Sequence, residues 1–169
     1  MRALAMLVLF SATSMAYADE PVRVSGPHGY AAYADAEQKK DHDEWGFAGA
    51  YRAGDYVYLS GVVAGAGRKD SITVDEFKER LRSTFKRADE TLKAADASLA
   101  DVVDLVSFHV FTSPRLQGDK DAHFNAVAEV KREFMTGADP AWTAIGISEL
   151  LPSGGLVEIR MVAYAPLKD

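Results

Sequence analysis

The stretch from Leu156 to Tyr164, LVEIRMVAY, constrains the fold more than any other part of the chain. Side chains of a β-strand alternate between two faces, so the stretch divides into an apolar and a partly polar set. The apolar face carries Val157, Ile159, Met161 and Ala163, and the other carries Leu156, Glu158, Arg160, Val162 and Tyr164. Because mid-strand charges are costly unless paired or solvated, we interpret the second face as part of a cleft or subunit interface. The alternative is that Glu158 and Arg160 pair with each other on a solvated sheet face.

The first 18 residues are predicted to form a secretory signal peptide. Arg2 precedes an apolar run from Ala3 to about Phe10, and Ala16-Tyr17-Ala18 provides an A-x-A cleavage site. A transmembrane helix needs roughly 20 apolar residues, so an uncleaved anchor is the weaker alternative. We therefore expect an exported protein without a stable membrane anchor, located in a bacterial periplasm or, alternatively, in the outside medium.

The composition narrows the possible partners and chemistry. Without residues 1–18 the chain has 18 basic and 25 acidic residues, a net charge of 18 − 25 = −7. Nucleic acid is not an expected partner, because affinity for it depends largely on clustered cations. The chain contains no Cys, which excludes disulfides, thiol catalysis and thiolate metal sites.

Residues 19–44 are interpreted as an N-terminal arm, with at most a short helix, because they show no clear strand or helix periodicity. His42 lies beside Asp41, Asp43 and Glu44, which could suggest a metal ion. Adjacent residues do not converge on one ion without a defined loop, so a solvated charge cluster is favoured and no metal site is predicted.

Residues 45–169 are predicted to form one α+β domain. Strands are expected at about 47–51, 56–63 and 102–112, helices from the capping box at Thr73 and over about 119–135, and two closing strands on either side of Pro152–Gly155. Both helices are apolar on one side only, so one sheet with both helices on one face is expected. The other sheet face then needs a cover, for which self-association is the natural solution.

Two further features could suggest a functional site, a dinucleotide-binding loop and a catalytic histidine, but neither is predicted to be one. Gly65-Ala66-Gly67 lacks the third glycine of a dinucleotide-binding loop. His109 lies in an apolar strand, where a hydrogen-bonded interior or interface histidine is favoured over a catalyst.

Four segments together resemble the YjgF/Rid family, the reactive-intermediate deaminases. They are Arg52–Gly61 (RAGDYVYLSG), Phe124–Val127 (FNAV), Asp139–Ala141 (DPA) and Leu151–Ile159 (LPSGGLVEI). The similarity covers roughly residues 45–166. It implies a chorismate-mutase-like fold with one mixed β-sheet, a homotrimer, and small-molecule clefts between the subunits.

The resemblance also implies a chemistry, the cofactor-free hydrolysis of enamines and imines, chiefly 2-iminoacids, to 2-oxoacids and ammonia. Transferred residue by residue, it makes Glu158 the glutamate that helps activate water. It makes Ser60 and Asn125 the serine and asparagine of the cleft. Phe47 stands where active members have a tyrosine, and Trp142 stands where they have the arginine that binds the substrate carboxylate.

These departures argue against the usual activity. A guanidinium–carboxylate contact is worth about 1.5 to 3 kcal/mol, so its loss weakens binding by roughly 10- to 150-fold. Trp142 and Phe47 instead favour a less polar or aromatic ligand. Arg160 could supply the missing cation, since it lies about 7 Å from Glu158 on the same strand face, or it could simply neutralise that carboxylate.

We therefore consider three functions. The first is a trimer that binds a small molecule in its interfacial clefts, with any hydrolysis differing from the usual 2-iminoacid reaction. The second is an active enamine/imine deaminase with Glu158 as the base. The third is a structural or chaperone-like trimer. RNA cleavage, sometimes assigned in this family, is disfavoured by the acidic composition.

Overall fold

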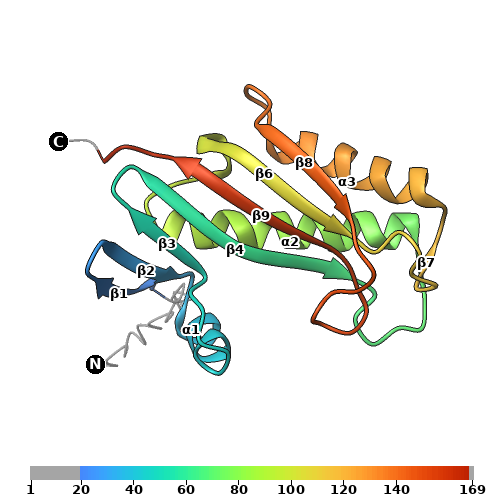
Figure 1. Cartoon of the computed structure of the whole chain (residues 1–169), viewed down its shortest axis with the longest axis horizontal. Helices are drawn as coiled ribbons and strands as arrows, with labels where there is room; N and C mark the ends of the chain where they lie inside the picture. The colour runs from blue at the N-terminus through green and yellow to red at the C-terminus, as the bar shows by residue number, and fades with distance from the viewer. Residues whose placement is uncertain (1–19, 168–169) are drawn as a thin grey trace, which may run out of the picture.

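The computed structural model describes residues 20–167, so the predicted signal peptide and its cleavage site lie outside the described residues. Figure 1 shows the order of the elements along the chain. They are β1 (Val22–Gly26), β2 (Gly29–Tyr33), α1 (Ala36–Asp43), β3 (Ala50–Ala53), β4 (Tyr56–Gly65), β5 (Ile72–Thr73), α2 (Val74–Ala94), a 3-10 turn (Leu99–Asp101), β6 (Val102–His109), β7 (Leu116–Gln117), α3 (Lys120–Phe134), β8 (Ala141–Gly146) and β9 (Gly155–Tyr164).

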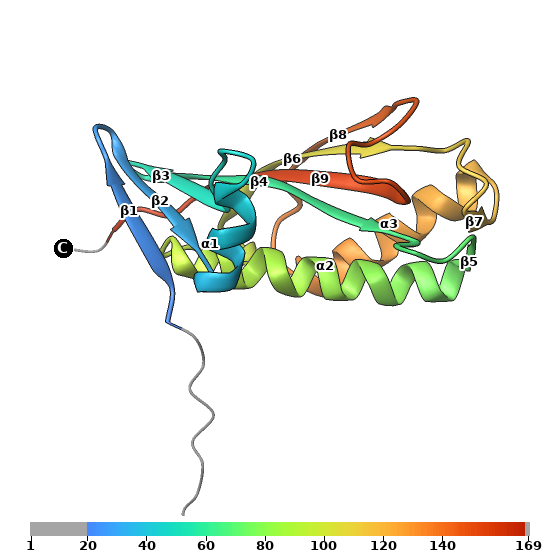
Figure 2. The same cartoon turned by 90° about the horizontal axis from the view of Figure 1, so that it is seen from below.

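Seven strands form one mixed sheet in the order β1-β2-β3-β4-β9-β6-β8. All neighbours in it are antiparallel except β6 and β8, which run parallel. Helices α2 and α3 lie together on one face of the sheet, and neither covers the opposite face (Figure 2). This arrangement confirms the predicted α+β fold with one mixed sheet and two helices on one face.

The two long helices begin where the sequence predicts. Thr73 caps α2, its hydroxyl accepting from the Glu76 amide while the Glu76 carboxylate accepts from the Thr73 amide. Asp119 caps α3 by accepting from the Ala122 amide. The apolar side of α2 is fully buried against the sheet, as Phe77 and Phe85 at 0% exposure show. The capping residues thus set the start of each helix, and burial of the apolar stripe sets its orientation.

The alternation predicted for β9 is correct except at Leu156. Val157, Ile159, Met161 and Ala163 are each 0% exposed and face the core, as expected. Leu156, assigned to the opposite face, is also 0% exposed. The pairing of β4 with β9 shifts register at this point, so strict alternation fails at the start of the strand.

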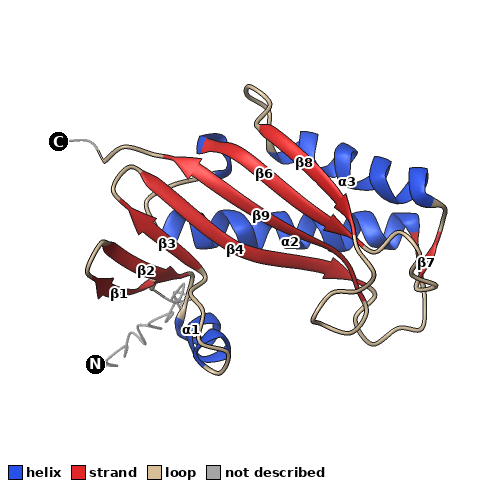
Figure 3. Cartoon of the chain, in the orientation of Figure 1, coloured by secondary structure: helices blue, strands red, loops and turns tan. Residues whose placement is uncertain are grey.

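The N-terminal segment contains two strands that the sequence did not predict. β1 and β2 form a hairpin that pairs through β2 with β3 and so extends the sheet (Figure 3). Arg23 anchors this hairpin to the end of α2 by donating to the Ala94 carbonyl and the Asp96 carboxylate. Gly, Ala and Ser, which have a low strand propensity or a small side chain, make up five of the ten residues of β1 and β2, so the sequence signal for these strands is weak.

The described part of the chain has no membrane-crossing helix, because none of its helices combines the necessary length and apolarity.

Candidate functional site

A pocket of about 670 Å³ opens on the sheet face that α2 and α3 leave uncovered. β4 and β9 form its floor, and the segments before β3 and before β9 form its rim. Its walls include the aromatic side chains of Phe47, Tyr51 and Tyr58 and the polar side chains of Ser60, Glu158 and Arg160. Four predicted site residues, Phe47, Ser60, Glu158 and Arg160, are therefore brought together in one chain.

A β-bulge lies at the centre of this pocket. Leu59 pairs with Met161 and Val62 pairs with Ile159, so Ser60 and Gly61 together stand opposite the single residue between them on β9. The bulge turns Val62 onto the core side, where it packs against buried residues. Strict alternation along β4 would place Val62 on the same face as Ser60, but the extra residue of the bulge reverses the alternation.

Gly61 leaves room for the Glu158 carboxylate. A Cβ built on Gly61 would lie 1.8 Å from Glu158 Oε1 and 2.6 Å from its Cδ. No side chain fits between the two residues without moving the carboxylate. The half-buried Glu158 is thus held against the backbone of the bulge, with its carboxylate at the pocket wall.

Ser60 organises the rim of the pocket. Its hydroxyl donates to the Ala48 carbonyl at 2.6 Å, and its amide donates to the Gly49 carbonyl at 3.0 Å. These bonds fix the segment that carries Phe47, whose ring contacts that of His42 in a tilted arrangement at a centroid distance of 4.4 Å. Since the hydroxyl proton is already used, Ser60 can offer a ligand its oxygen lone pairs.

Arg160 is exposed at the pocket wall. Among the salt bridges between residues 20 and 167, none joins it to Glu158. The structure therefore does not show the direct pairing of Glu158 and Arg160 that the sequence offered as an alternative. Both remain on the pocket surface, where each can meet a ligand.

Trp142 lies on the opposite face of the sheet from Glu158. Leu105 of β6 pairs with both Trp142 of β8 and Met161 of β9, so all three side chains point toward the helices. The indole stacks on Phe124 of α3 at a centroid distance of 5.2 Å. Within one chain, Trp142 therefore does not line the pocket that contains Glu158, because its register with Leu105 turns its side chain toward the helices.

A buried chain of polar side chains fixes the indole. Trp142 Nε1 donates to Ser107 Oγ at 2.8 Å, which lies 2.8 Å from His109 Nε2. His109 Nδ1 lies in turn 3.3 Å from His123 Nε2. Burial lowers the pKa of each histidine to about 4, so both are neutral at physiological pH. His109 is 0% exposed and hydrogen-bonded, as the sequence predicts, which leaves it no access to a ligand.

Asn125 also lies away from the Glu158 pocket. It is exposed on α3, next to the Phe124 that stacks on Trp142. The predicted site residues therefore form two separate groups in one chain, one on each side of the sheet.

Sequence reasoning missed several residues of the pocket. Tyr58 and Tyr51 are cross-strand partners on its wall, and Leu151, which is 86% exposed, lies at its rim. Alternation along β4 already put Tyr58 on the face of Ser60, so this signal was present in the sequence. Nothing comparable marked Leu151, because its position depends on the loop before β9.

The pocket combines a carboxylate with apolar walls. Such a site suits a small, partly apolar molecule and a proton transfer to or from it. No group of three or more His, Cys, Asp or Glu side chains that could hold a metal ion occurs in residues 20–167.

Comparisons with known proteins agree with this architecture. The family model described as Endoribonuclease L-PSP matches residues 44–165. The RutC family protein YjgH of Escherichia coli is 31% identical over 121 residues, which cover 71% of this chain and 83% of that protein. A 2-iminobutanoate/2-iminopropanoate deaminase of Dermatophagoides farinae is 26% identical over 116 residues, 69% of this chain and 83% of that protein.

Solved structures show the same fold. The structure of protein YjgH has a TM-score of 0.58 and 30% identity, covering 75% of this chain and 89% of that one. A member of the YjgF/YER057c/UK114 family from Mycobacterium tuberculosis has a TM-score of 0.59 and 23% identity, covering 86% of this chain and all of that one. The match over residues 44–165, together with the relatives, shows that the chain belongs to the YjgF/Rid family.

Proposed function

We propose that the protein binds a small, weakly polar molecule in the Glu158 pocket and hydrolyses a C=N bond in it, with a substrate preference different from the usual 2-iminoacids. The observation that carries this proposal is the Glu158 carboxylate held against Gly61 in a pocket walled by aromatic rings. A carboxylate in that position can accept a proton from a water molecule beside a bound ligand.

The reaction needs only water and one acid–base group. Glu158 takes a proton from water as the oxygen attacks the imine carbon, and the proton passes to the nitrogen. The resulting carbinolamine then loses ammonia and becomes a carbonyl compound. The balance is R₂C=NH + H₂O → R₂C=O + NH₃, with Glu158 regenerated as the carboxylate.

The pocket walls support a less polar substrate. Phe47 and Tyr58 are 43% and 42% exposed and offer ring surface for stacking. Trp142 replaces the arginine that would bind a carboxylate, and its indole is already held by Ser107. A substrate carboxylate therefore has no cation at that position.

We also propose that the uncovered sheet face is the interface of a trimer. Three aromatic side chains on it, Tyr56, Tyr58 and Tyr164, are each more than 40% exposed. Burial of this area against another subunit would be favourable. In such a trimer, Trp142 and Asn125 of one subunit would complete the Glu158 pocket of the next. Export to the periplasm, based on residues 1–18, remains part of this proposal.

A second candidate function is the usual 2-iminoacid deamination. Arg160 favours it, because its guanidinium lies at the pocket wall with no salt bridge to the described residues and could bind the substrate carboxylate. The relative from Dermatophagoides farinae, whose name states this activity, gives it further support.

One assay separates the candidates. Ammonia release is measured from 2-iminopropanoate, 2-iminobutanoate and an aromatic imine without a carboxylate. The wild type is compared with Glu158→Gln and with the control variant Glu149→Gln, which changes an exposed glutamate outside the pocket. The proposal expects fastest turnover of the aromatic imine, loss of turnover in Glu158→Gln and no loss in the control.

The same assay tests whether a guanidinium group binds the substrate carboxylate, either at position 160 or, after substitution, at position 142. If the wild type instead prefers 2-iminobutanoate and Arg160→Gln lowers kcat/KM by about 10-fold or more, the second candidate holds. Gain of 2-iminoacid turnover in Trp142→Arg would place Trp142 in the completed pocket. Absence of turnover with every imine in wild type and variants alike would refute both candidates and leave a structural role, and a monomer in light scattering would refute the trimer.

A further inference from the structure

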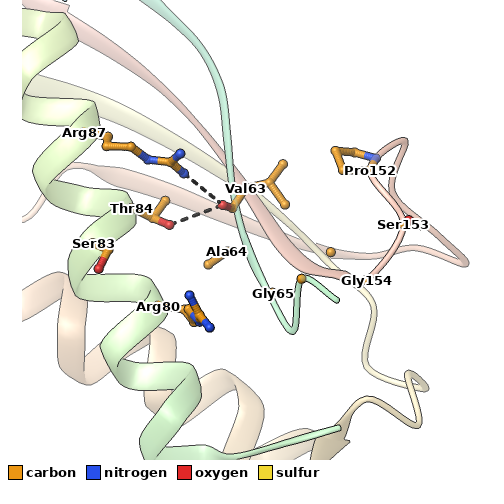
Figure 4. A pocket seen from close by; sticks show the side chains of 12 residues that line it. Val63, Ala64, Gly65, Arg80, Ser83, Thr84, Arg87, Pro152, Ser153 and Gly154 are labelled. Atoms are coloured by element: carbon orange, nitrogen blue, oxygen red, sulfur yellow. Dashed lines mark hydrogen bonds between the residues drawn. The ribbon is translucent and has the colours of Figure 1, made fainter. Parts of the chain in front are cut away.

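A second cavity, of about 400 Å³, lies between α2 and the loop that leads into β9. Figure 4 shows Arg80, Ser83 and Arg87 on the α2 side and Ser153 and Gly154 on the loop across from them. The end of β4 lies between these two walls. The cavity is separate from the Glu158 pocket, although both touch Val63 and Pro152.

The two arginines lie on the same side of α2. They are seven residues apart, which is nearly two full helical turns and a rise of about 10 Å. Long guanidinium side chains at this spacing can reach a common ion between them. Ser83 lies on the same side, three residues after Arg80, and adds a hydroxyl group.

Neither arginine forms a salt bridge with a carboxylate of the described residues, although Glu76 and Glu79 line a neighbouring cavity with Arg80, and Glu90 lines one with Arg87. Arg82, which lies between them in sequence, pairs with Glu79 and Glu133. Arg80 and Arg87 form no salt bridge within residues 20–167, and none of the described residues lining the cavity is acidic. Arg87 makes only a 3.5 Å contact to the Val63 carbonyl. In a chain with a net charge of −6, two unpaired cations in one cavity point to an anionic ligand.

The opposite wall is kept free of large side chains. Gly154 has φ +84°, and a Cβ there would lie 2.7 Å from the Gly67 carbonyl oxygen. Its own carbonyl accepts from the Ala66 amide at 2.9 Å, which ties the two loops together. Ser153 is exposed beside it and offers a second hydroxyl. The Ser153 hydroxyl thus faces the arginines across the cavity.

We infer that this cavity binds a small phosphate-bearing anion, either inorganic phosphate or a phosphate monoester. Two guanidinium groups supply the charge for a dianion, and the Ser153 hydroxyl can donate to one of its remaining oxygens, whereas the Ser83 hydroxyl already donates to the Glu79 carbonyl at 3.1 Å. A carboxylate has one charge and two oxygens and would use only part of this donor set.

The test is a titration of the folded, ¹⁵N-labelled protein with inorganic phosphate at low ionic strength, followed by NMR. Saturable shifts are expected for the amides of Gly154 and Gly155 and for the guanidinium groups of Arg80 and Arg87. Arg80→Gln and Arg87→Gln should each weaken phosphate binding by about 5- to 10-fold. Both side chains are exposed, so the variants are expected to fold, and circular dichroism checks this.

Lys86→Gln is the matched control. It removes the same charge from an exposed position on α2, and Lys86 does not line the cavity. Its phosphate affinity should stay within about 2-fold of wild type, because long-range charge effects are screened. Equal weakening by all three substitutions, absence of saturable shifts, or equally tight binding of acetate would each overturn the inference. A monoester that binds more tightly than inorganic phosphate supports it and identifies the monoester as the ligand, and the reverse order identifies free phosphate.

Discussion

Replacing Gly61 by alanine tests whether the position of the Glu158 carboxylate determines activity. The added methyl group would lie 1.8 Å from Oε1, whereas ordinary contacts begin at 3.4 Å, so the oxygen must move by about 3.4 − 1.8 = 1.6 Å. Gly61 has no positive φ, so alanine suits the backbone there. The substitution therefore acts on the whole Glu158 side chain, because its Cγ would also lie only 2.7 Å from the new methyl group.

A displacement of this size has a large expected effect on rate. A misplacement of about 1 Å at a reacting group can cost about 100-fold, which corresponds to about 2.7 kcal/mol of transition-state stabilisation. We expect kcat/KM for the imine that wild type hydrolyses fastest to fall by about 100-fold in Gly61→Ala. The free energy of unfolding should change by less than about 1 kcal/mol, because the substitution also reduces the entropy of the unfolded chain.

Gly137→Ala provides the matched control. A Cβ at Gly137 meets nothing within 4 Å and its φ is not positive, so this variant should keep full activity. Wild-type kcat/KM in a folded Gly61→Ala protein would refute the reasoning, since it would mean that the position of the carboxylate against the bulge is irrelevant to turnover. A crystal structure of the variant would show the displaced Glu158 directly.

Three further predictions concern stability. Because burial lowers the pKa of His109 and His123 to about 4, only the unfolded chain gains protons there as the pH falls from 6.5 to 4. The free energy of unfolding should therefore drop by up to about 3 kcal/mol per histidine in that window, and urea melts that match at pH 7 and 4.5 would contradict this. Trp142→Phe removes the bond to Ser107 and should lower the free energy of unfolding by about 1 to 3 kcal/mol in the same assay. Arg52 is 2% exposed, and its guanidinium group donates to the carbonyls of four residues. Lysine has a single ammonium group and cannot make these bonds in the same geometry, so Arg52→Lys should lower the melting temperature by several degrees. An unchanged melting temperature would contradict this prediction.

Side-chain alternation and capping residues correctly predicted the core strands and the two long helices. Val157 and Ile159 face the core because the apolar face of a central strand is stable only when it is buried. Thr73 starts α2 because its capping box satisfies the hydrogen-bonding needs of two backbone amides. Glu158 and Arg160 were found on the open face by the same alternation. The sequence was therefore sufficient for the core, the long helices and half of the candidate site.

The features that the sequence did not predict depend on how strands far apart in the chain pair with one another. Trp142 faces the helices because β8 pairs with β6 in the register that places it beside Leu105, and nothing within β8 indicates that register. Leu156 and Val62 changed sides because register shifts between β4 and β9 reverse the alternation. The β1–β2 hairpin depends on the free edge of β3 rather than on its own weak pattern.

The position of β9 has a consequence for how the chain is made. This strand is the last element of the sequence, yet it lies between β4 and β6 and joins the two halves of the sheet. Until Gly155–Tyr164 leaves the ribosome, the strands made earlier lack the neighbour that lies between β4 and β6, so cooperative folding of the sheet must wait for β9. Any cellular machinery that acts on the nascent polypeptide would meet it before its native state can form.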